Sequence, residues 1–182
     1  NHKGQFREVA EEIAPGLENI GMVTAALWTD YNQDNWTDLI VVGEWMEITL
    51  FENQSGRLVL KENIPGLAGS TGWWNSIIGA DINQDGQTDY IIGNLGLNSR
   101  YKSSENNPLQ IHWADFDKNG KSEAIISYIE DGKRYPMHPR DDIFQQIPSL
   151  KKKFNDYHSY AQATLSTLLG QAYLDSTENK LE

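Results

Sequence analysis

The chain has 182 residues, of which 26 are acidic and 15 are basic, and its formal net charge is −11. This charge argues against a nucleic-acid partner, which requires a basic patch, and against an anionic membrane surface. The sequence contains no cysteine, so disulfides, thiolate metal sites and thiol nucleophiles are excluded. No segment is long and apolar enough to predict a membrane span.

Three short acidic segments follow one pattern along the first two thirds of the chain. They read DYNQDNWTD at residues 30–38, DINQDGQTD at 81–89 and DFDKNGKSE at 115–123. Short runs rich in Ile, Val, Trp and Tyr lie on both sides of each segment, and this composition is typical of β-strands. We therefore predict three β-hairpins, each with an acidic loop at its tip.

A second element also recurs. The segment NQSGRL at residues 53–58 resembles NHKGQF at residues 1–6, which indicates a repeat of about 50 residues and a further hairpin around 53–56. The repeat then shortens, because only 34 residues separate Asp81 from Asp115. The run of apolar residues at 39–42 predicts a strand that is buried on both faces.

The pattern changes after Tyr135. Apolar residues recur at steps of three and four from Ile143 to Leu168, which predicts two or three short helices packed on the β part. Pro148 should interrupt these helices, Asn155 or Asp156 could cap a new one, and Gly170 is a natural end.

The expected organisation is therefore three consecutive segments. Residues 1–135 form the β repeats, residues 136–172 form the helical segment, and residues 173–182 form a tail that is frayed from 175 onwards.

The acidic segments have the pattern of calcium loops. Calcium prefers six to eight oxygen ligands, which a curled loop can supply from side chains at positions 1, 3 and 5, a backbone carbonyl at position 7 and a closing acid at position 9. The predicted ligands are Asp30, Asn32, Asp34, the Trp36 carbonyl and Asp38 in loop one; Asp81, Asn83, Asp85, the Gln87 carbonyl and Asp89 in loop two; and Asp115, Asp117, Asn119, the Lys121 carbonyl and Glu123 in loop three.

Position 6 of such a loop must turn sharply, and the three loops differ there. Gly86 and Gly120 accept a positive φ without steric cost, and Asn35 is the next-best residue for it. We therefore rank loop one below loops two and three. The alternative is that Asp, Asn and Gly simply form turns. A turn does not require an acid at position 9, however, and three loops with the same residue pattern favour a metal site.

These loops are not EF-hands. An EF-hand requires a bidentate Glu at position 12, and the residues there are Val41, Ile92 and Ile126. All three are apolar and fall inside predicted strands. The closing acid at position 9 instead predicts a short loop across a β-hairpin.

The pattern Asp-x-Asp/Asn-x-Asp/Asn-Gly-x-x-Asp/Glu between strands resembles the FG-GAP, or VCBS, repeat, the calcium loop of integrin α-chain propellers and of many bacterial surface proteins. The segment NHKGQFREV resembles the linking element of that family. The stretches GNLGLNSRY, NPLQIHWADFDKNG and GKRYPMHPRDDIFQQIPSLKKKF resemble bacterial proteins of the ASPIC/UnbV-associated type. Those proteins are secreted or surface-anchored and often accompany glycan-uptake systems.

This resemblance implies a β-propeller, usually with seven blades. Three loop-bearing units cannot close a ring of four to eight blades. We therefore expect a mainly β fold, namely a partial propeller of about three blade-like units with a C-terminal helical segment, as a fragment of a longer chain.

The sequence shows no catalytic constellation. The four histidines form no His-Glu-x-x-His motif, and His112 is expected to be structural. A polar cluster of His138, Arg140, Asp141 and Asp142 could line a pocket, although a connector that caps a helix is the better interpretation.

Trp73 and Trp74 could form a platform for sugar stacking, but core packing is slightly favoured for this pair. Large aromatic rings contribute much of the buried area in a protein core, so an adjacent pair of this kind is readily explained by packing.

The favoured function is a non-catalytic, calcium-stabilised binding or scaffold module of an exported bacterial surface protein, with a glycan or another surface protein as its partner. One alternative is part of a calcium-dependent, lyase-like enzyme acting on polysaccharide. The other is an integrin-like adhesion domain.

Overall fold

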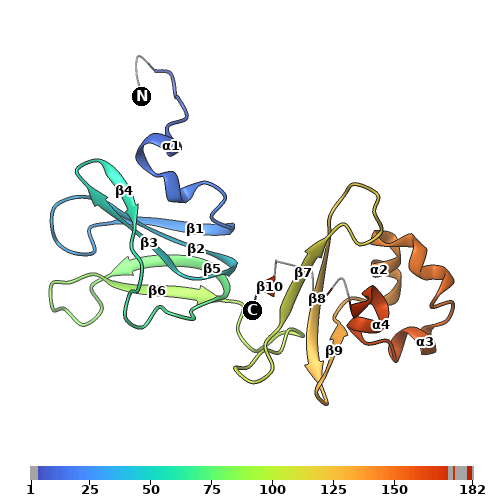
Figure 1. Ribbon diagram of the computed structural model, residues 1–182. Helices are drawn as coiled ribbons and strands as arrows, with labels where there is room; N and C mark the ends of the chain where they lie inside the picture. Colours follow the sequence, from blue (N-terminus) through green and yellow to red (C-terminus); the bar gives the residue numbers. More distant parts are fainter. Residues whose placement is uncertain (1–3, 172–173, 175–179, 182) are drawn as a thin grey trace. The chain divides into compact units, whose positions relative to one another are not determined.

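The computed structural model describes residues 4–171, 174 and 180–181, and the chain forms two compact units, Asn1–Gly96 and Leu97–Glu182 (Figure 1). Each unit contains an antiparallel β-sheet, which confirms the prediction of a mainly β protein. The strands that are described do not form a closed propeller ring. No helix in the described part of the chain is long and apolar enough to cross a membrane.

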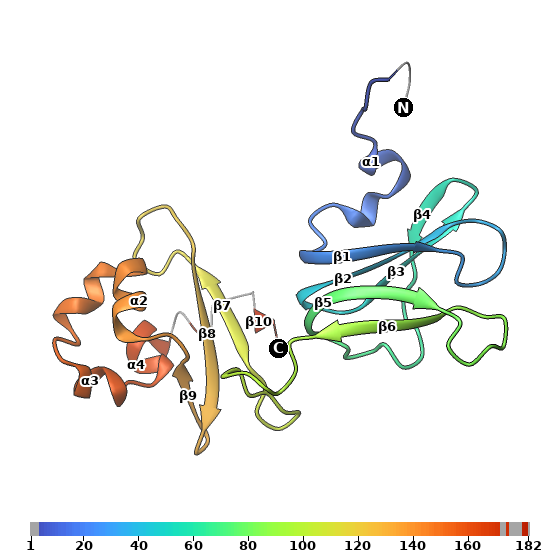
Figure 2. The same cartoon turned by 180° about the vertical axis from the view of Figure 1, so that it is seen from behind.

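The first unit is a six-stranded sheet preceded by two helical turns. The turns are α1 (Ala10–Ile13) and η1 (Pro15–Leu17), and the strands are β1 (Met22–Thr29), β2 (Asp38–Met46), β3 (Thr49–Gln54), β4 (Arg57–Leu60), β5 (Gly72–Ala80) and β6 (Asp89–Asn94). Strands β1 to β4 form an antiparallel meander, and β5 pairs with the end of β2. The β1–β2 and β5–β6 loops lie at the same end of this unit (Figure 2).

Strand β2 is the centre of the first unit, and it is buried on both faces as predicted. Leu39 and Val41 pack into one apolar cluster with Phe51 from β3. Ile40 and Val42 alternate with them and pack into a second cluster on the opposite face. A strand that contributes to two cores requires a continuous apolar run, which explains the sequence of this segment.

The hairpin predicted around residues 53–56 is present as β3 and β4. Its two-residue turn is formed by Ser55 and Gly56, whose φ angles are 56° and 95°. Two consecutive positive φ angles are typical of the turn that matches the twist of a two-residue hairpin. The Asn53 side chain accepts a hydrogen bond from the Gly56 amide at 2.7 Å and so fixes this turn.

The second unit has a four-stranded sheet in the order β10-β7-β8-β9, with helices on one side of it (Figures 1 and 2). The strands are β7 (Gln110–Ala114), β8 (Glu123–Glu130), β9 (Lys133–Pro136) and β10 (Lys180–Leu181), and the helical elements are α2 (Arg140–Gln146), η2 (Pro148–Lys152), α3 (Tyr157–Ala161) and α4 (Leu165–Leu169). The predicted short helices are thus confirmed.

The ends of these helices follow the predicted signals. Pro148 is the first residue of η2, and Ile147 alone separates it from the end of α2. The Asp156 side chain accepts a hydrogen bond from the Ser159 amide at 2.8 Å and caps α3. Gly170 ends α4 with a φ of 89°, a conformation that glycine adopts without steric cost.

The helices and the third hairpin share one apolar core. Ile125 of β8 and Phe116 of the preceding loop pack with Ile143 and Leu165 from the helices. The third hairpin and the helices therefore form one unit, and the compact units divide after Gly96 rather than at the predicted boundary at residue 135. The sequence pattern marks where helices begin but not which strands share a core with them.

Parts of three predicted segments lie outside the described residues. They are residues 1–3 of the segment NHKGQF, residue 172 of the predicted helical segment, and residues 173, 175–179 and 182 of the predicted tail. Within the predicted tail, Lys180 and Leu181 form β10 and pair with His112 and Ile111 of β7, so this part is not frayed.

Candidate cation-binding loops

The three acidic loops connect paired strands, as predicted: β1 to β2, β5 to β6 and β7 to β8. Each loop starts directly after its first strand, and its closing acid is the first residue of the second strand. Hairpin pairing therefore brings position 1 and position 9 together. The register pairs Ala114 with Glu123, for example, so that Asp115 and Glu123 are neighbours.

All three loops contain the same backbone-to-side-chain hydrogen bonds. The backbone amide of position 5 donates to the side chains at positions 1 and 3, and the amide of position 6 donates to the side chain at position 1. The amide of position 7 donates to the side chain at position 5, and the amide of position 2 donates to the closing acid at position 9. These donor–acceptor distances lie between 2.7 and 3.2 Å in the loops at residues 30–38, 81–89 and 115–123.

The backbone conformation of the three loops is also the same. Position 6 has a positive φ, with values of 68° for Asn35, 84° for Gly86 and 85° for Gly120. Asn35 therefore adopts the left-handed conformation that was predicted for position 6. Position 4 has a positive φ as well, at Gln33, Gln84 and Lys118. This position could not be predicted from the sequence, because Gln and Lys give no signal for a left-handed backbone.

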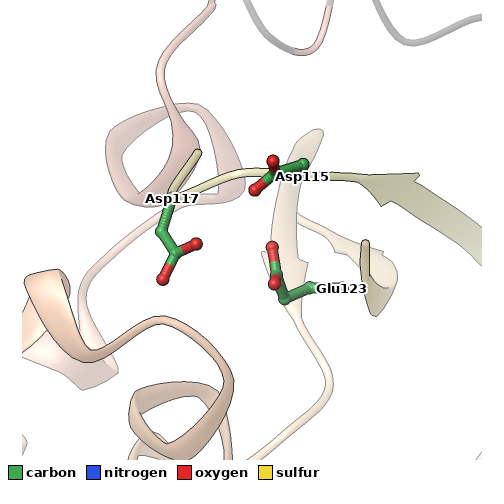
Figure 3. Close-up of side chains that lie close together, drawn as sticks. All are labelled: Asp115, Asp117 and Glu123. Atoms are coloured by element: carbon green, nitrogen blue, oxygen red, sulfur yellow. The ribbon is translucent and has the colours of Figure 1, made fainter. Parts of the chain in front are cut away.

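Loop three brings three carboxylates together. One oxygen each from Asp115, Asp117 and Glu123 lies within 4.8 Å of the others, and Figure 3 shows these side chains directed into a common space. Asp115 and Asp117 are half-buried and Glu123 is buried. Oxygen donors of this charge and spacing fit a hard cation such as calcium. Without a cation, carboxylates this close repel one another.

Loops one and two have an amide at position 3 instead of a carboxylate. The Nδ2 of Asn32 donates to Oδ2 of Asp34 at 2.9 Å, and the Nδ2 of Asn83 donates to Oδ2 of Asp85 at 3.0 Å. In each pair the amide donor offsets part of the repulsion between the carboxylates of the loop. Among the residues described, loop three alone contains a group of three acids within 4.8 Å. Ligation by the carbonyls of Trp36, Gln87 and Lys121 stays a prediction.

Loop one is tied to the neighbouring hairpin. Asp38 is fully buried, and its two oxygens accept hydrogen bonds from the Tyr31 amide at 3.1 Å and the Asn53 amide at 2.7 Å. The Asn53 side chain also donates to the Thr37 carbonyl at 2.8 Å. The closing acid of loop one therefore connects β2 to β3 in addition to closing its own loop.

Tryptophans occupy one equivalent position beside two of the loops. Trp28 and Trp113 lie two residues before the first acid of loops one and three, and their exposed fractions are 60% and 53%. Gly79 has this position before loop two. A Cβ atom at Gly79 would lie 2.9 Å from the Thr88 side chain and 3.3 Å from that of Leu27, so a larger residue there would require these side chains to shift.

The polar cluster at residues 138–142 connects helices. The Arg140 guanidinium stacks over the Tyr157 ring at 3.8 Å and contacts Asp141 at 3.1 Å, and the Tyr157 hydroxyl donates to Asp141 at 2.7 Å. The hydrogen bond from Tyr157, followed by the one from Arg140, lowers the pKa of Asp141. These contacts hold α2 against α3. Pro139 precedes α2 and provides no side-chain cap.

His138 lies beside this cluster, and its Nδ1 is buried without a hydrogen-bond partner among the residues described. Its carbonyl accepts a hydrogen bond from the Tyr160 hydroxyl at 2.7 Å. Burial, and then the charge of Arg100, lowers the pKa of His138, although Asp142 acts in the opposite direction. The neutral imidazole is therefore the favoured form.

The remaining candidate residues, Trp73, Trp74 and His112, pack against other parts of the protein. Trp73 and Trp74 are half-buried: the Trp74 Nε1 donates to the Ser70 carbonyl at 2.9 Å, and the Trp73 ring lies 5.3 Å from that of Trp45. Core packing therefore describes this pair better than a sugar platform. His112 is 1% exposed, as expected of a structural residue.

The comparison with protein families agrees with the loop geometry. Residues 30–92 match the FG-GAP-like repeat. This repeat begins at loop one and ends in β6, so it contains loops one and two. Loop three lies outside the matched residues, but it has the same hydrogen bonds as the two loops inside them. Searches of curated proteins and of solved structures found no match.

Proposed function

We propose that this chain is a calcium-stabilised binding or scaffold module built from FG-GAP-like hairpins, and that it is not an enzyme. The observation that carries the proposal is the group of three carboxylates in loop three, within a loop geometry shared by all three hairpins. A cation held there would join the end of β7 to the start of β8, because Asp115 follows the first strand and Glu123 begins the second.

Loop three is the strongest candidate because of the side chain at position 3. Oδ1 of Asp117 accepts the Asn119 amide, which leaves the second carboxylate oxygen for a metal. Asn32 and Asn83 each have one oxygen, and that oxygen already accepts the amide of position 5. Loop three has an amide of this kind at position 5, where Asn119 accepts the Lys121 amide, but in loops one and two the position-3 amide also donates to Oδ2 of the position-5 acid. Because that second bond occupies a further carboxylate oxygen, we expect loops one and two to bind calcium more weakly than loop three.

The strand order supports a propeller-type array. Strands β1 to β4 form a four-stranded antiparallel meander, which is the composition of a propeller blade. Loop one joins β1 and β2, the first two strands of this meander, and loop two joins β5 and β6 in the same way. In this proposal the hairpins belong to an integrin-like, propeller-type module.

The proposed location is outside the cytosol. Calcium sites in extracellular modules bind with dissociation constants on the order of 10⁻⁴ to 10⁻³ M, and such sites fill where calcium is abundant. The proposed partner is a glycan or another surface protein. The acidic charge of −11 supports a partner other than nucleic acid.

Thermal unfolding with calcium and with a chelator tests this proposal. Calcium should raise the unfolding midpoint, because a ligand that binds only the folded state stabilises it. The variant Asp117→Asn, which gives loop three the amide found in loops one and two, should lose most of that rise. Asp131→Asn removes the same charge from the β8–β9 turn and is the matched control. Equal midpoints with calcium and chelator for the unaltered protein would refute the proposal.

A further inference from the structure

Loop three contains the single Asn-Gly dipeptide of the sequence, Asn119 and Gly120, at positions 5 and 6. Both residues are exposed, and a Cβ atom added at Gly120 would meet no atom within 4 Å apart from its chain neighbours. Loops one and two have an acid at position 5, Asp34 and Asp85. Because glycine has no side chain, its backbone nitrogen can approach the side chain of a preceding asparagine and react with it.

A carboxylate lies at the nitrogen that would react. The Gly120 amide donates to Oδ2 of Asp115 at 2.8 Å. A general base must lie within about 2.6 to 3.2 Å of the atom from which it takes a proton, and Asp115 meets this condition. The other oxygen of Asp115, Oδ1, accepts the Asn119 amide at 3.0 Å and so fixes the carboxylate in this position.

The side chain of Asn119 is held in a position that favours attack on its carbonyl. Its Oδ1 accepts the Lys121 amide at 2.8 Å, and such a hydrogen bond strengthens when the oxygen gains negative charge. The asparagines at position 3 of loops one and two differ in two ways. Nδ2 of Asn32 and of Asn83 donates to a carboxylate, and a glutamine follows each of them. The arrangement needed for the reaction is therefore found at Asn119 and not at these two residues.

We propose that Asn119 is a site of self-modification, at which the side-chain amide is converted to a carboxylate. The Gly120 nitrogen attacks Cγ of Asn119 while Asp115 takes the proton from that nitrogen. A cyclic imide forms as the Cγ–Nδ2 bond breaks, and Nδ2 leaves with the proton as ammonia. Water then opens the imide: cleavage at Cγ yields aspartate, and cleavage at the main-chain carbonyl yields isoaspartate. The net reaction consumes water and releases ammonia, without any oxidation or reduction.

The aspartate product would give loop three the position-5 acid that loops one and two already have. Residue 119 would then add a carboxylate to the group formed by Asp115, Asp117 and Glu123. Higher ligand charge tightens calcium binding, so the modification would regulate the proposed calcium site. This consequence rests on the proposed function, whereas the conversion itself requires no calcium.

Peptide mapping of the full chain by mass spectrometry tests the proposal. The chain is incubated with chelator at neutral pH, and the conversion of each asparagine is followed with time. Asn119 should convert about tenfold faster than Asn75 and Asn98, which are exposed, precede serine and serve as internal controls. Incubation in heavy-oxygen water should place the label in residue 119. Conversion no faster than that of the two controls would overturn the proposal.

The role of Asp115 is tested by unfolding and by substitution. The folded chain should convert Asn119 at least as fast as the chain in guanidinium chloride, where Asp115 no longer contacts Gly120. Asp115→Asn should slow the conversion about tenfold. Asp81→Asn removes the same charge from position 1 of loop two and should leave the rate unchanged. Unfolding midpoints above the incubation temperature would show that both variants are folded. Slower conversion in the folded chain than in the denatured chain, or equal rates in the two variants, would overturn the proposal.

The variant Asn119→Asp separates this inference from the calcium proposal. It has the product side chain from the start, so its calcium-dependent rise of the unfolding midpoint should exceed that of the unaltered chain. If Asn119 converts as expected while calcium raises neither midpoint, the self-modification stands and the calcium proposal fails. If calcium raises both midpoints while Asn119 does not convert, the calcium proposal stands and the self-modification is refuted.

Discussion

Loops one and three have the same hydrogen bonds and the same positive φ angles, but they are stabilised by different partners. In loop one, the closing acid Asp38 is fully buried and also accepts the amide of Asn53 from β3. In loop three, Glu123 faces two further carboxylates within 4.8 Å. Loop one is stabilised by a hydrogen bond from a neighbouring strand, whereas loop three has a group of carboxylates whose negative charge a cation would neutralise. A common loop geometry is therefore not sufficient evidence that two loops depend equally on metal.

The largest expected effect is that of Asp38→Ala. The substitution leaves the amides of Tyr31 and Asn53 without their acceptor in a buried site, so the free energy of unfolding of the first unit should fall by about 3 kcal/mol. Denaturant unfolding followed by tryptophan fluorescence measures it. The loss should be the same with calcium and with chelator.

Asp89→Ala is the matched control for this substitution. Asp89 closes loop two, is half-buried, and accepts the Ile82 amide at 3.0 Å, so its loss should be smaller. A loss at Asp38 that appears only in the presence of calcium would show that Asp38 acts through a metal, and the contrast between the loops would then disappear.

Removal of calcium should have the second-largest effect, and it should be confined to one region. At a calcium concentration about a hundred times the dissociation constant, binding stabilises the folded state by about 2.7 kcal/mol. Chelation should therefore increase amide hydrogen exchange in β7 and β8 much more than in β1 and β2. Equal increases in both hairpins would mean that loop one depends on the cation as much as loop three.

A smaller effect is expected from adding a carboxylate to loop two. Asn83→Asp gives this loop the donor set of loop three at position 3, and the added charge should tighten calcium binding about tenfold. Competition with a chromophoric chelator measures the change. Gln87→Glu adds the same charge at a position whose side chain is not a predicted ligand. An equal gain for both variants would indicate a general charge effect.

The smallest effect should be a dependence of the second unit on pH. Burial and Arg100 lower the pKa of His138, so below the ordinary histidine pKa of about 6.5 the unfolded chain binds a proton more readily than the folded one. The free energy of unfolding should therefore decrease as the pH falls from about 6.5 toward the lowered pKa. Denaturant unfolding in chelator at several pH values measures this slope.

The variant His138→Gln should flatten that slope, while His158→Gln at an exposed position of α3 should keep it. A slope that survives His138→Gln would assign the pH dependence to other groups.

The sequence predicted those features that depend on neighbours along the chain. The three hairpins, the left-handed Asn35 and the cap at Asp156 all follow from a few adjacent residues. The bond from the Asn53 amide to Asp38 was not predictable, because it joins residues that are distant in sequence and involves a backbone group.

The same reason applies to the packing of the helices. The apolar periodicity from Ile143 to Leu168 predicted the helices, but their core with Ile125 depends on tertiary contacts that periodicity does not encode. The cavity lined by residues of β7, of β9 and of the start of α4 was not predicted, because these residues are distant in sequence and form no motif.

The position of Trp113 has a practical consequence for spectroscopy. It is the single tryptophan in residues 97–182 of the sequence, and it lies two residues before the first acid of loop three. With an exposed fraction of 53%, its indole emission responds to the polarity around the tip of this hairpin. Replacing the five tryptophans of the first unit with phenylalanine would leave a native fluorophore that reports on one loop alone, without any attached dye.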